Sequence, residues 1–108
     1  MAATVEYKIN REKLEKAAYI LRTVAHPTRL AIVDLLKLNE RLSVNEMSEI
    51  IGVEQSLLSH HLKTMKLAGI LKSEKEGQSV FYSLKERDVT KLIDCIEHCD
   101  CNLQGISF

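Results

Sequence analysis

A short helix followed by a tight turn is the feature that most constrains the fold of this chain. Within SVNEMSEIIGV, Ser43 precedes Glu46 by three residues, the spacing at which the two side chains form a capping box at a helix start. Gly52 readily adopts the left-handed conformation that ends a helix. We therefore expect a helix over about 44–51.

A second helix is expected directly after this turn, within EQSLLSHHLKTMKLAGIL, and Gly69 marks its end. Its apolar face consists of Leu58, Leu62 and Met65, with Leu57 and His61 beside them. About three residues separate the two helices, which is the spacing of a helix-turn-helix motif, here over about 43–68. In that motif the second helix is the one presented to the major groove of DNA.

The flanking segments predict a mainly α domain with a small β-hairpin. The pattern changes to alternation over 70–74 and 80–84 around the turn-forming EKEGQ, which predicts a hairpin, or wing, over about 70–84. Further helices are expected from Asn10 to Val24, over HPTRLAIVDLLKL with Pro27 in the first turn, and over about 86–100. The expected fold is a winged helix-turn-helix of order α-α-α-α-β-β-α in a single domain, 1–108.

Composition and charge indicate which cellular compartment and which partners to expect. The chain lacks a run of ~18 to 20 apolar residues and its N-terminus lacks a secretion signal, so we expect a cytoplasmic protein without membrane contact. The formal net charge is zero, but residues 55–85 carry five lysines against two glutamates. A basic middle favours an anion-binding surface. A domain of 108 residues gains stability from burial against a second copy, so a dimer is expected.

The order and spacing of three segments resemble a known family. AHPTRLAIVDLL, SVNEMSEIIGVEQSLLSHHLKTMKLAGIL and EGQSVFYSL are similar to the ArsR/SmtB family of winged helix-turn-helix repressors, in register from about Val5 to Cys99. The resemblance implies a homodimer that forms through the first and last helices. It also implies release from operator DNA when a metal, a metalloid or another inducer binds.

Polar residues on the second helix and the wing are the candidates for DNA contact. The helix residues avoid the apolar face, and a capped helix before them and a basic hairpin after them favour DNA contact over a merely solvated surface. His61 is expected to pack internally. The candidates are Gln55, Ser56, Ser59, His60 and Lys63 on the helix and Lys75, Gln78 and Ser79 in the wing. Two such units on a two-fold axis would read a palindrome with half-sites ~34 Å apart.

The segment CIEHCDC holds all three cysteines of the chain and suggests a second site. Cys95 and Cys99 lie within one helical turn, beside His98, and Cys101 joins them only if the helix ends near Cys99. Asp88 lies ~16 Å from Cys99 along the helix axis, so it could complete a site only across a dimer. Soft thiolates with one histidine suit Zn(II), Cd(II), Cu(I) or Pb(II), and three thiolates suit As(III).

The resemblance adds constraints on this second site. Family members with a zinc-type site on the last helix place two ligands near its start, where Glu86 and Asp88 stand here, and two near its end. Ser43 and Asn45 occupy the positions of the cysteines of the arsenic-type site, which excludes that site. The family's persulfide-sensing members pair a cysteine on the helix that corresponds to PTRLAIVDLLKL with one on the last helix, and PTRLAIVDLLKL has none, which excludes that pairing.

Several alternatives remain open at this stage. Cys95 and Cys99 could form a reversible disulfide, or the cysteines could serve only packing. The chain could be a DNA-binding regulator without a metal inducer, or a protein-interaction module that does not bind DNA. An enzyme is not expected, because the sequence has no phosphate-cradling glycine loop and the sequential His60 and His61 face different ways.

Overall fold

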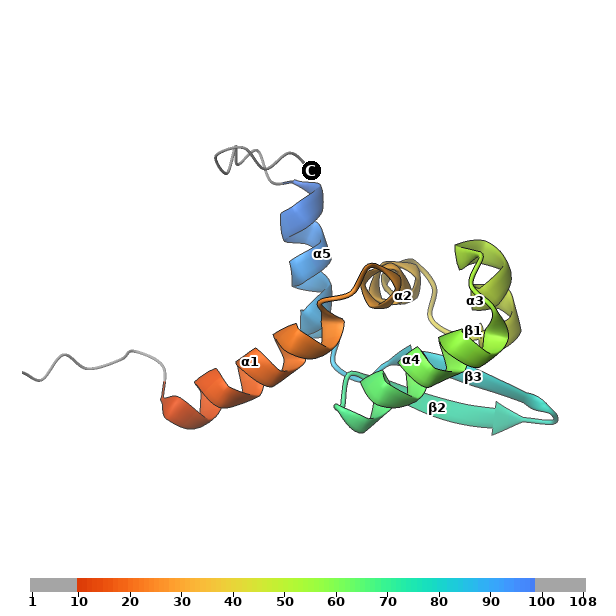
Figure 1. Cartoon of the computed structure of the whole chain (residues 1–108), viewed down its shortest axis with the longest axis horizontal. Coiled ribbons are helices and arrows are strands. Elements are labelled where there is room, and N and C mark those ends of the chain that lie inside the picture. The colour runs from red at the N-terminus through yellow and green to blue at the C-terminus, as the bar shows by residue number, and fades with distance from the viewer. Residues whose placement is uncertain (1–9, 99–108) are drawn as a thin grey trace, which may run out of the picture.

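The computed structural model describes residues 10–98, which form a mainly helical domain with a small antiparallel sheet (Figure 1). The elements are α1 (Arg11–Val24), α2 (Pro27–Leu38), β1 (Leu42–Ser43), α3 (Val44–Ile51), α4 (Gln55–Leu67), β2 (Leu71–Glu76), β3 (Ser79–Leu84), the 3-10 turn η1 (Arg87–Val89) and α5 (Thr90–Glu97). The winged helix-turn-helix order expected from the sequence is confirmed.

The helix-turn-helix forms where the local signals placed it. The Glu46 backbone N–H donates to Ser43 Oγ at 3.1 Å and the Ser43 N–H donates to Glu46 Oε1 at 2.9 Å, which completes the capping box. Gly52 follows α3 in the left-handed conformation with φ of 79°. Three residues, 52–54, then separate α3 from α4.

The sheet has one strand more than expected. β2 and β3 pair in the register Leu71 with Leu84 through Glu76 with Ser79, which confirms the wing. β1 pairs with the other edge of β3, with Leu42 opposite Tyr82, so the strand order is β1-β3-β2. β1 was not expected from the sequence, because a strand of two residues is too short to show alternation. Leu42 is buried, and its pairing with Tyr82 joins the start of the helix-turn-helix to β3 of the wing.

The core lies between α2, α3, α4 and the sheet. Its fully buried side chains are Ile32, Val33, Leu36, Met47, Leu58, Leu62, Met65, Ile70 and Leu71. One expectation about the core faces was wrong: Leu57, expected beside the apolar face of α4, is 51% exposed. Leu38, at the last position of α2, is also exposed.

α1 and α5 project from this core in different directions (Figure 1). Each keeps apolar side chains at its surface: Leu14, Tyr19 and Leu21 on α1 and Ile96 on α5. The last helix is shorter than expected, because Arg87–Val89 forms a 3-10 turn and α5 ends at Glu97 with His98 as its C-cap. Among residues 10–98, no helix is long and apolar enough to cross a membrane.

Candidate nucleic-acid interface

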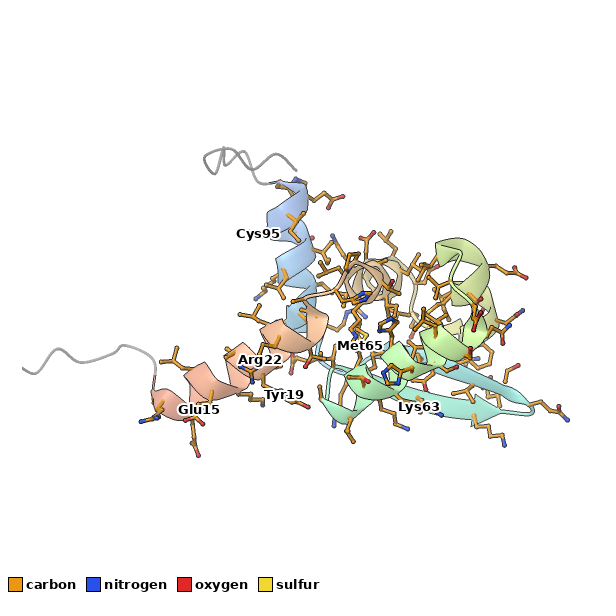
Figure 2. All side chains as sticks on the ribbon, viewed as in Figure 1. Glu15, Tyr19, Arg22, Lys63, Met65 and Cys95 are labelled. Carbon is orange, nitrogen blue, oxygen red and sulfur yellow. The ribbon has the colours of Figure 1, made fainter. Side chains whose placement is uncertain are left out.

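α4 has one buried face and one polar face, as expected for a helix that is held by the core and presented to a partner. Leu58, His61, Leu62 and Met65 are buried. Of the five candidates on this helix, Ser59 is half-buried and the others, Gln55, Ser56, His60 and Lys63, are exposed. Lys63 extends into solvent from the side of α4 that faces away from α2 and α3 (Figure 2).

Arg29 of α2 holds α4 in place through His61. The Arg29 Nε–H donates to His61 Nδ1 at 3.0 Å, and an Arg29 Nη–H donates to the Thr23 carbonyl oxygen at 2.9 Å. One guanidinium thus joins the end of α1 to the middle of α4. The prediction that His61 packs and bonds internally is confirmed. Burial, assisted by the neighbouring Arg29, His26 and His60, lowers the pKa of His61, which favours the neutral ring that accepts this bond.

A polar groove brings four of the eight candidates together. It has a volume of about 230 Å³ and lies between the starts of α3 and α4 and the tip of the wing. Its lining consists of Ser43, Val44, Asn45, Gln55, Ser59, Gln78, Ser79 and Val80. Gln55 and Ser59 from α4 therefore share one concave surface with Gln78 and Ser79 from the wing. Hydroxyl and amide groups of this kind can hydrogen-bond base edges or phosphates.

The other four candidates lie outside this groove. Ser56 Oγ donates to Glu54 Oε1 at 2.5 Å, so its hydroxyl has an internal partner. His60 and Lys63 are exposed further along α4, and Lys75 is exposed near the end of β2. Lys63 and Lys75 thus place positive charge on the helix and the wing that border the polar groove.

Arg41, which was not among the candidates expected from the sequence, holds the wing. An Arg41 Nη–H donates to Glu76 Oε2 at 2.7 Å, and the guanidinium lies 4.2 Å from the centroid of the Phe81 ring. The hydrogen bond and the charge of Arg41 lower the pKa of Glu76, so this carboxylate stays ionised beside the hairpin turn. No local sequence signal joins Arg41 to Glu76, because the contact depends on the pairing of β1 with β3.

The candidate metal ligands fall at the other end of the molecule. Asp88 lies in η1, where its carboxylate is 3.6 Å from Lys91 Nζ. Cys95 is an exposed free thiol on α5, on the side directed away from the core (Figure 2), and His98 follows at the C-cap. Cys99 and Cys101 lie outside the described residues. Within residues 10–98, no group of three His, Cys, Asp or Glu side chains is arranged to hold a metal ion.

Lys37 anchors α5 beside these candidates. Its ammonium group donates to Asp94 Oδ1 and lies 3.6 Å from Glu97 Oε2. These two acidic residues flank Cys95 in the sequence. An Arg87 Nη–H also donates to the Lys37 carbonyl oxygen at 3.3 Å. The candidate metal ligands Cys95 and His98 therefore lie on, or directly after, a helix that is tied to the end of α2. Cys95 and His98 are soft enough for a thiophilic ion but supply only two ligands.

Two helices joined by a three-residue turn, with a hairpin beside the second helix, define a winged helix-turn-helix DNA-binding domain. Residues 26–73 match the family described as "Bacterial regulatory protein, arsR family". The SmtB transcriptional repressor of Mycobacterium tuberculosis is 37% identical over 89 residues, which is 82% of this chain and 65% of SmtB. The chain thus spans just under two thirds of that relative.

Two further relatives are similar over most of their own length. The cadmium resistance transcriptional regulatory protein CadC homolog of Staphylococcus aureus is 34% identical, with 82% of this chain and 79% of that protein covered. The structure of HlyU from Vibrio cholerae, a transcriptional activator, has a TM-score of 0.76 at 34% identity and covers 85% of this chain and 99% of HlyU. The chain belongs to the arsR family, and the relatives named here are transcriptional regulators rather than enzymes.

Proposed function

We propose that this chain is a homodimeric repressor that binds palindromic operator DNA through α4 and the wing and is released by a soft metal ion or metalloid at α5. The observation that carries the DNA-binding part is the polar groove, where Gln55 and Ser59 of α4 meet Gln78 and Ser79 of the wing. Ser56, His60, Lys63 and Lys75 lie outside the groove on the same helix and wing, and would contact phosphates or flanking bases.

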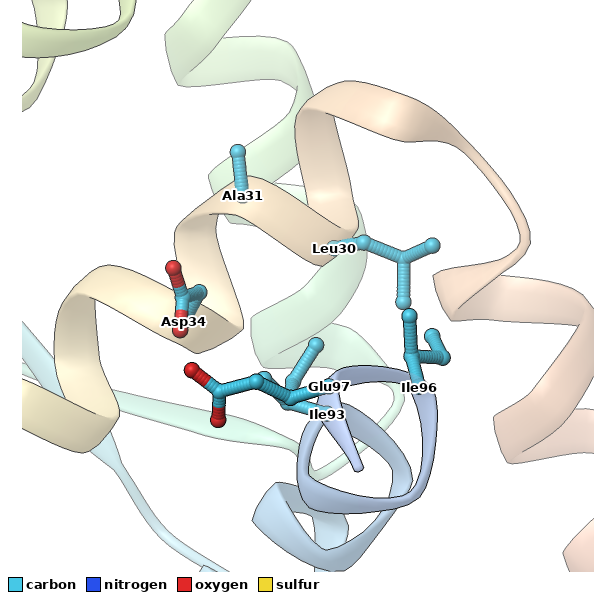
Figure 3. Close-up of a pocket in the computed structure, with 6 residues that line it drawn as sticks. All are labelled: Leu30, Ala31, Asp34, Ile93, Ile96 and Glu97. Carbon is cyan, nitrogen blue, oxygen red and sulfur yellow. The ribbon is translucent and has the colours of Figure 1, made fainter. Parts of the chain in front are cut away.

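The proposed dimer forms through α1 and α5. Leu14, Tyr19 and Leu21 leave an apolar surface on α1, and Ile96 leaves one on α5. Ile96 also lines an open groove of about 320 Å³ between α2 and α5, with Leu30, Ala31, Asp34, Ile93 and Glu97 (Figure 3). Exposed apolar surface of this extent on two projecting helices is typical of a protein interface.

Sedimentation equilibrium tests the dimer. Leu21→Asp and Ile96→Asp should shift the chain toward monomer, because each would bury a charge at the interface. Ile50→Asp, which changes a comparably exposed residue on α3, is the matched control and should leave the dimer intact. A dimer that survives both interface substitutions would refute this arrangement.

The proposed effector site uses Cys95 with His98, Cys99 and Cys101, and takes Asp88 from the second chain. Thiolates favour Zn(II), Cd(II), Pb(II), Cu(I) or As(III), and similarity to a cadmium resistance regulator supports this class of inducer. Binding can release DNA only if the ligand prefers a dimer spacing that no longer fits successive major grooves. Lys37, which ties α5 to α2, offers a route by which a shift of α5 reaches the DNA-binding core.

Titration of the protein–DNA complex tests the effector. The reduced protein, bound to fluorescent DNA from its own promoter, would be titrated with each ion and then with peroxide, and release followed by anisotropy. We expect release at about one soft ion per chain, with thiolate-to-metal absorption. Cys95→Ser should bind DNA as wild type does but no longer respond. Glu49→Gln, which removes an exposed carboxylate on α3, is the control and should respond normally.

Other outcomes of this titration assign other functions. Release by peroxide alone would replace metal sensing by a thiol switch. DNA binding without release by any ion or by peroxide would leave a regulator that has no such inducer. Failure to bind promoter DNA at low salt would refute the repressor and favour a protein-interaction module.

A further inference from the structure

The exposed side chain of Asn45 lies against Gln55, the first residue of α4. The Gln55 Nε2–H donates to Asn45 Oδ1 at 2.7 Å. Both residues are exposed and both line the polar groove. The contact therefore joins two amides at the surface that the proposed function assigns to DNA.

The backbones that carry this amide pair are fixed relative to one another. Asn45 is the second residue of α3, directly after the capping box, and the buried Met47 anchors the same helix in the core. Ser48 Oγ donates to the Val53 carbonyl oxygen at 2.6 Å, which ties α3 to the turn before α4. The turn between the helix that carries Asn45 and the helix that carries Gln55 is therefore held by a hydrogen bond of its own.

As placed, the hydrogen bond turns Nε2 of the Gln55 amide toward Asn45 Oδ1. An amide carries a donor nitrogen and an acceptor oxygen, and its rotation by 180° exchanges them. With Nε2 directed at Asn45 Oδ1, the Gln55 carbonyl oxygen and its second N–H remain for a partner in the groove. A carbonyl oxygen and an N–H are the pair with which glutamine recognises the N6 and N7 edge of adenine.

We propose that Asn45 is a positioning residue that orients the Gln55 amide and thereby sets the base that Gln55 reads. The inference rests on the proposed function, because it assumes that Gln55 reaches a base edge. Asn45 itself contacts no base. Prior ordering of Gln55 also reduces the entropic cost of its immobilisation on DNA, which contributes about 2- to 12-fold in affinity.

The base preferences of single variants test the proposal. The purified full chain would be equilibrated with a randomised double-stranded DNA library, and affinities for the selected site and its single-base replacements measured by anisotropy. Gln55→Ala identifies the base pair that Gln55 reads, where a bidentate contact gives about 5- to 150-fold discrimination. Asn45→Leu, of similar size but without an acceptor, should lose at least about fivefold of the discrimination at that same base pair.

A conservative variant separates positioning from a structural role. Asn45→Asp keeps the acceptor for Gln55 Nε2–H, so the discrimination ratio should survive even though the added charge weakens binding to all DNA. Asn45→Leu should bind non-specific DNA within twofold of wild type, which shows that the fold and the lysine contacts persist. The double variant Asn45→Leu/Gln55→Ala should discriminate no worse than Gln55→Ala alone.

Three results would overturn the proposal. Full discrimination in Asn45→Leu would show that Gln55 needs no partner. A further loss of discrimination in the double variant, beyond that of Gln55→Ala, would show that Asn45 contacts a base directly. If Gln55→Ala keeps every base preference, both this inference and the assignment of Gln55 to the interface fail, whereas the first two results leave that assignment standing.

Discussion

Replacement of Arg29 by methionine tests whether one guanidinium positions the proposed DNA-reading helix. Arg29→Met keeps an apolar stem of similar length but removes the donors that reach His61 Nδ1 and the Thr23 carbonyl oxygen. His61 is only 5% exposed, so water cannot readily replace the lost donor. The substitution therefore breaks the link between α1 and α4 with little change in packing.

The size of the effect follows from the two bonds. A hydrogen bond from a charged donor contributes about 1.5 to 3 kcal/mol to stability. Arg29 is half-buried, so the lower figure applies to each bond. We expect Arg29→Met to reduce the free energy of unfolding by about 3 kcal/mol. Arg29→Lys should recover less than half of that loss, because a single ammonium group does not reproduce the planar geometry that reaches both acceptors.

Urea denaturation followed by circular dichroism measures this effect. The protein concentration must be the same for all variants, because dimer formation would add a concentration-dependent term to the stability. Arg22→Met, an exposed arginine on the last turn of α1, is the matched control and should change stability by less than about 0.5 kcal/mol. If Arg29→Met is as stable as this control, the guanidinium does not hold α4 and the reasoning is refuted.

Three further outcomes follow from the described contacts. Because the pKa of His61 is lowered in the fold, the unfolded chain takes up that proton more readily, so stability is complete above pH ~6.5 and falls as the pH drops below it. Urea titrations at pH 7.5 and 5.5 should show this loss, and His61→Gln should reduce it. Ser43→Ala removes the α3 cap and should cost about 1 kcal/mol, measured by the same titration with the exposed Ser56→Ala as control. Lys63→Ala should weaken binding to all DNA sequences and lower the salt slope by about one, whereas Lys16→Ala on α1 should leave the slope unchanged.

The helix-turn-helix could be predicted from the sequence because its determinants are local. Ser43 and Glu46 are three residues apart and Gly52 closes the same helix, so each signal lies within one or two turns. The burial of Leu58 and Leu62 follows from helical spacing alone. Helix ends were harder to place. Nothing in the pattern of 86–100 distinguishes the 3-10 turn at Arg87–Val89 from the α5 helix that follows.

The contacts that hold α4 and the wing in place could not be predicted in the same way. Arg29 and His61 are 32 residues apart, and Arg41 and Glu76 are 35 apart, so each pair forms only after the core and the sheet have brought distant segments together. Asn45 lies closer to Gln55, ten residues away, yet at the level of sequence its only bearing was to exclude an arsenic-type site. The signal that could have found it is the short turn itself, which brings the start of α3 near the start of α4.

The two ends of the molecule differ in how firmly the described contacts hold their functional groups. Gln55 and its neighbours stand on helices with a capping box, a braced turn and a fully buried core beneath them. Cys95 and His98 stand on α5, which has no fully buried residue and is tied to α2 by the ion pairs of Lys37. In the proposed dimer, a ligand that draws two copies of α5 together would work against these ion pairs and the half-buried contacts of Leu92 and Ile93, not against fully buried side chains. In the proposed repressor, displacement of α5 would then shift the spacing of the two DNA-reading units without unfolding either, which is the change that the proposed release from an operator requires.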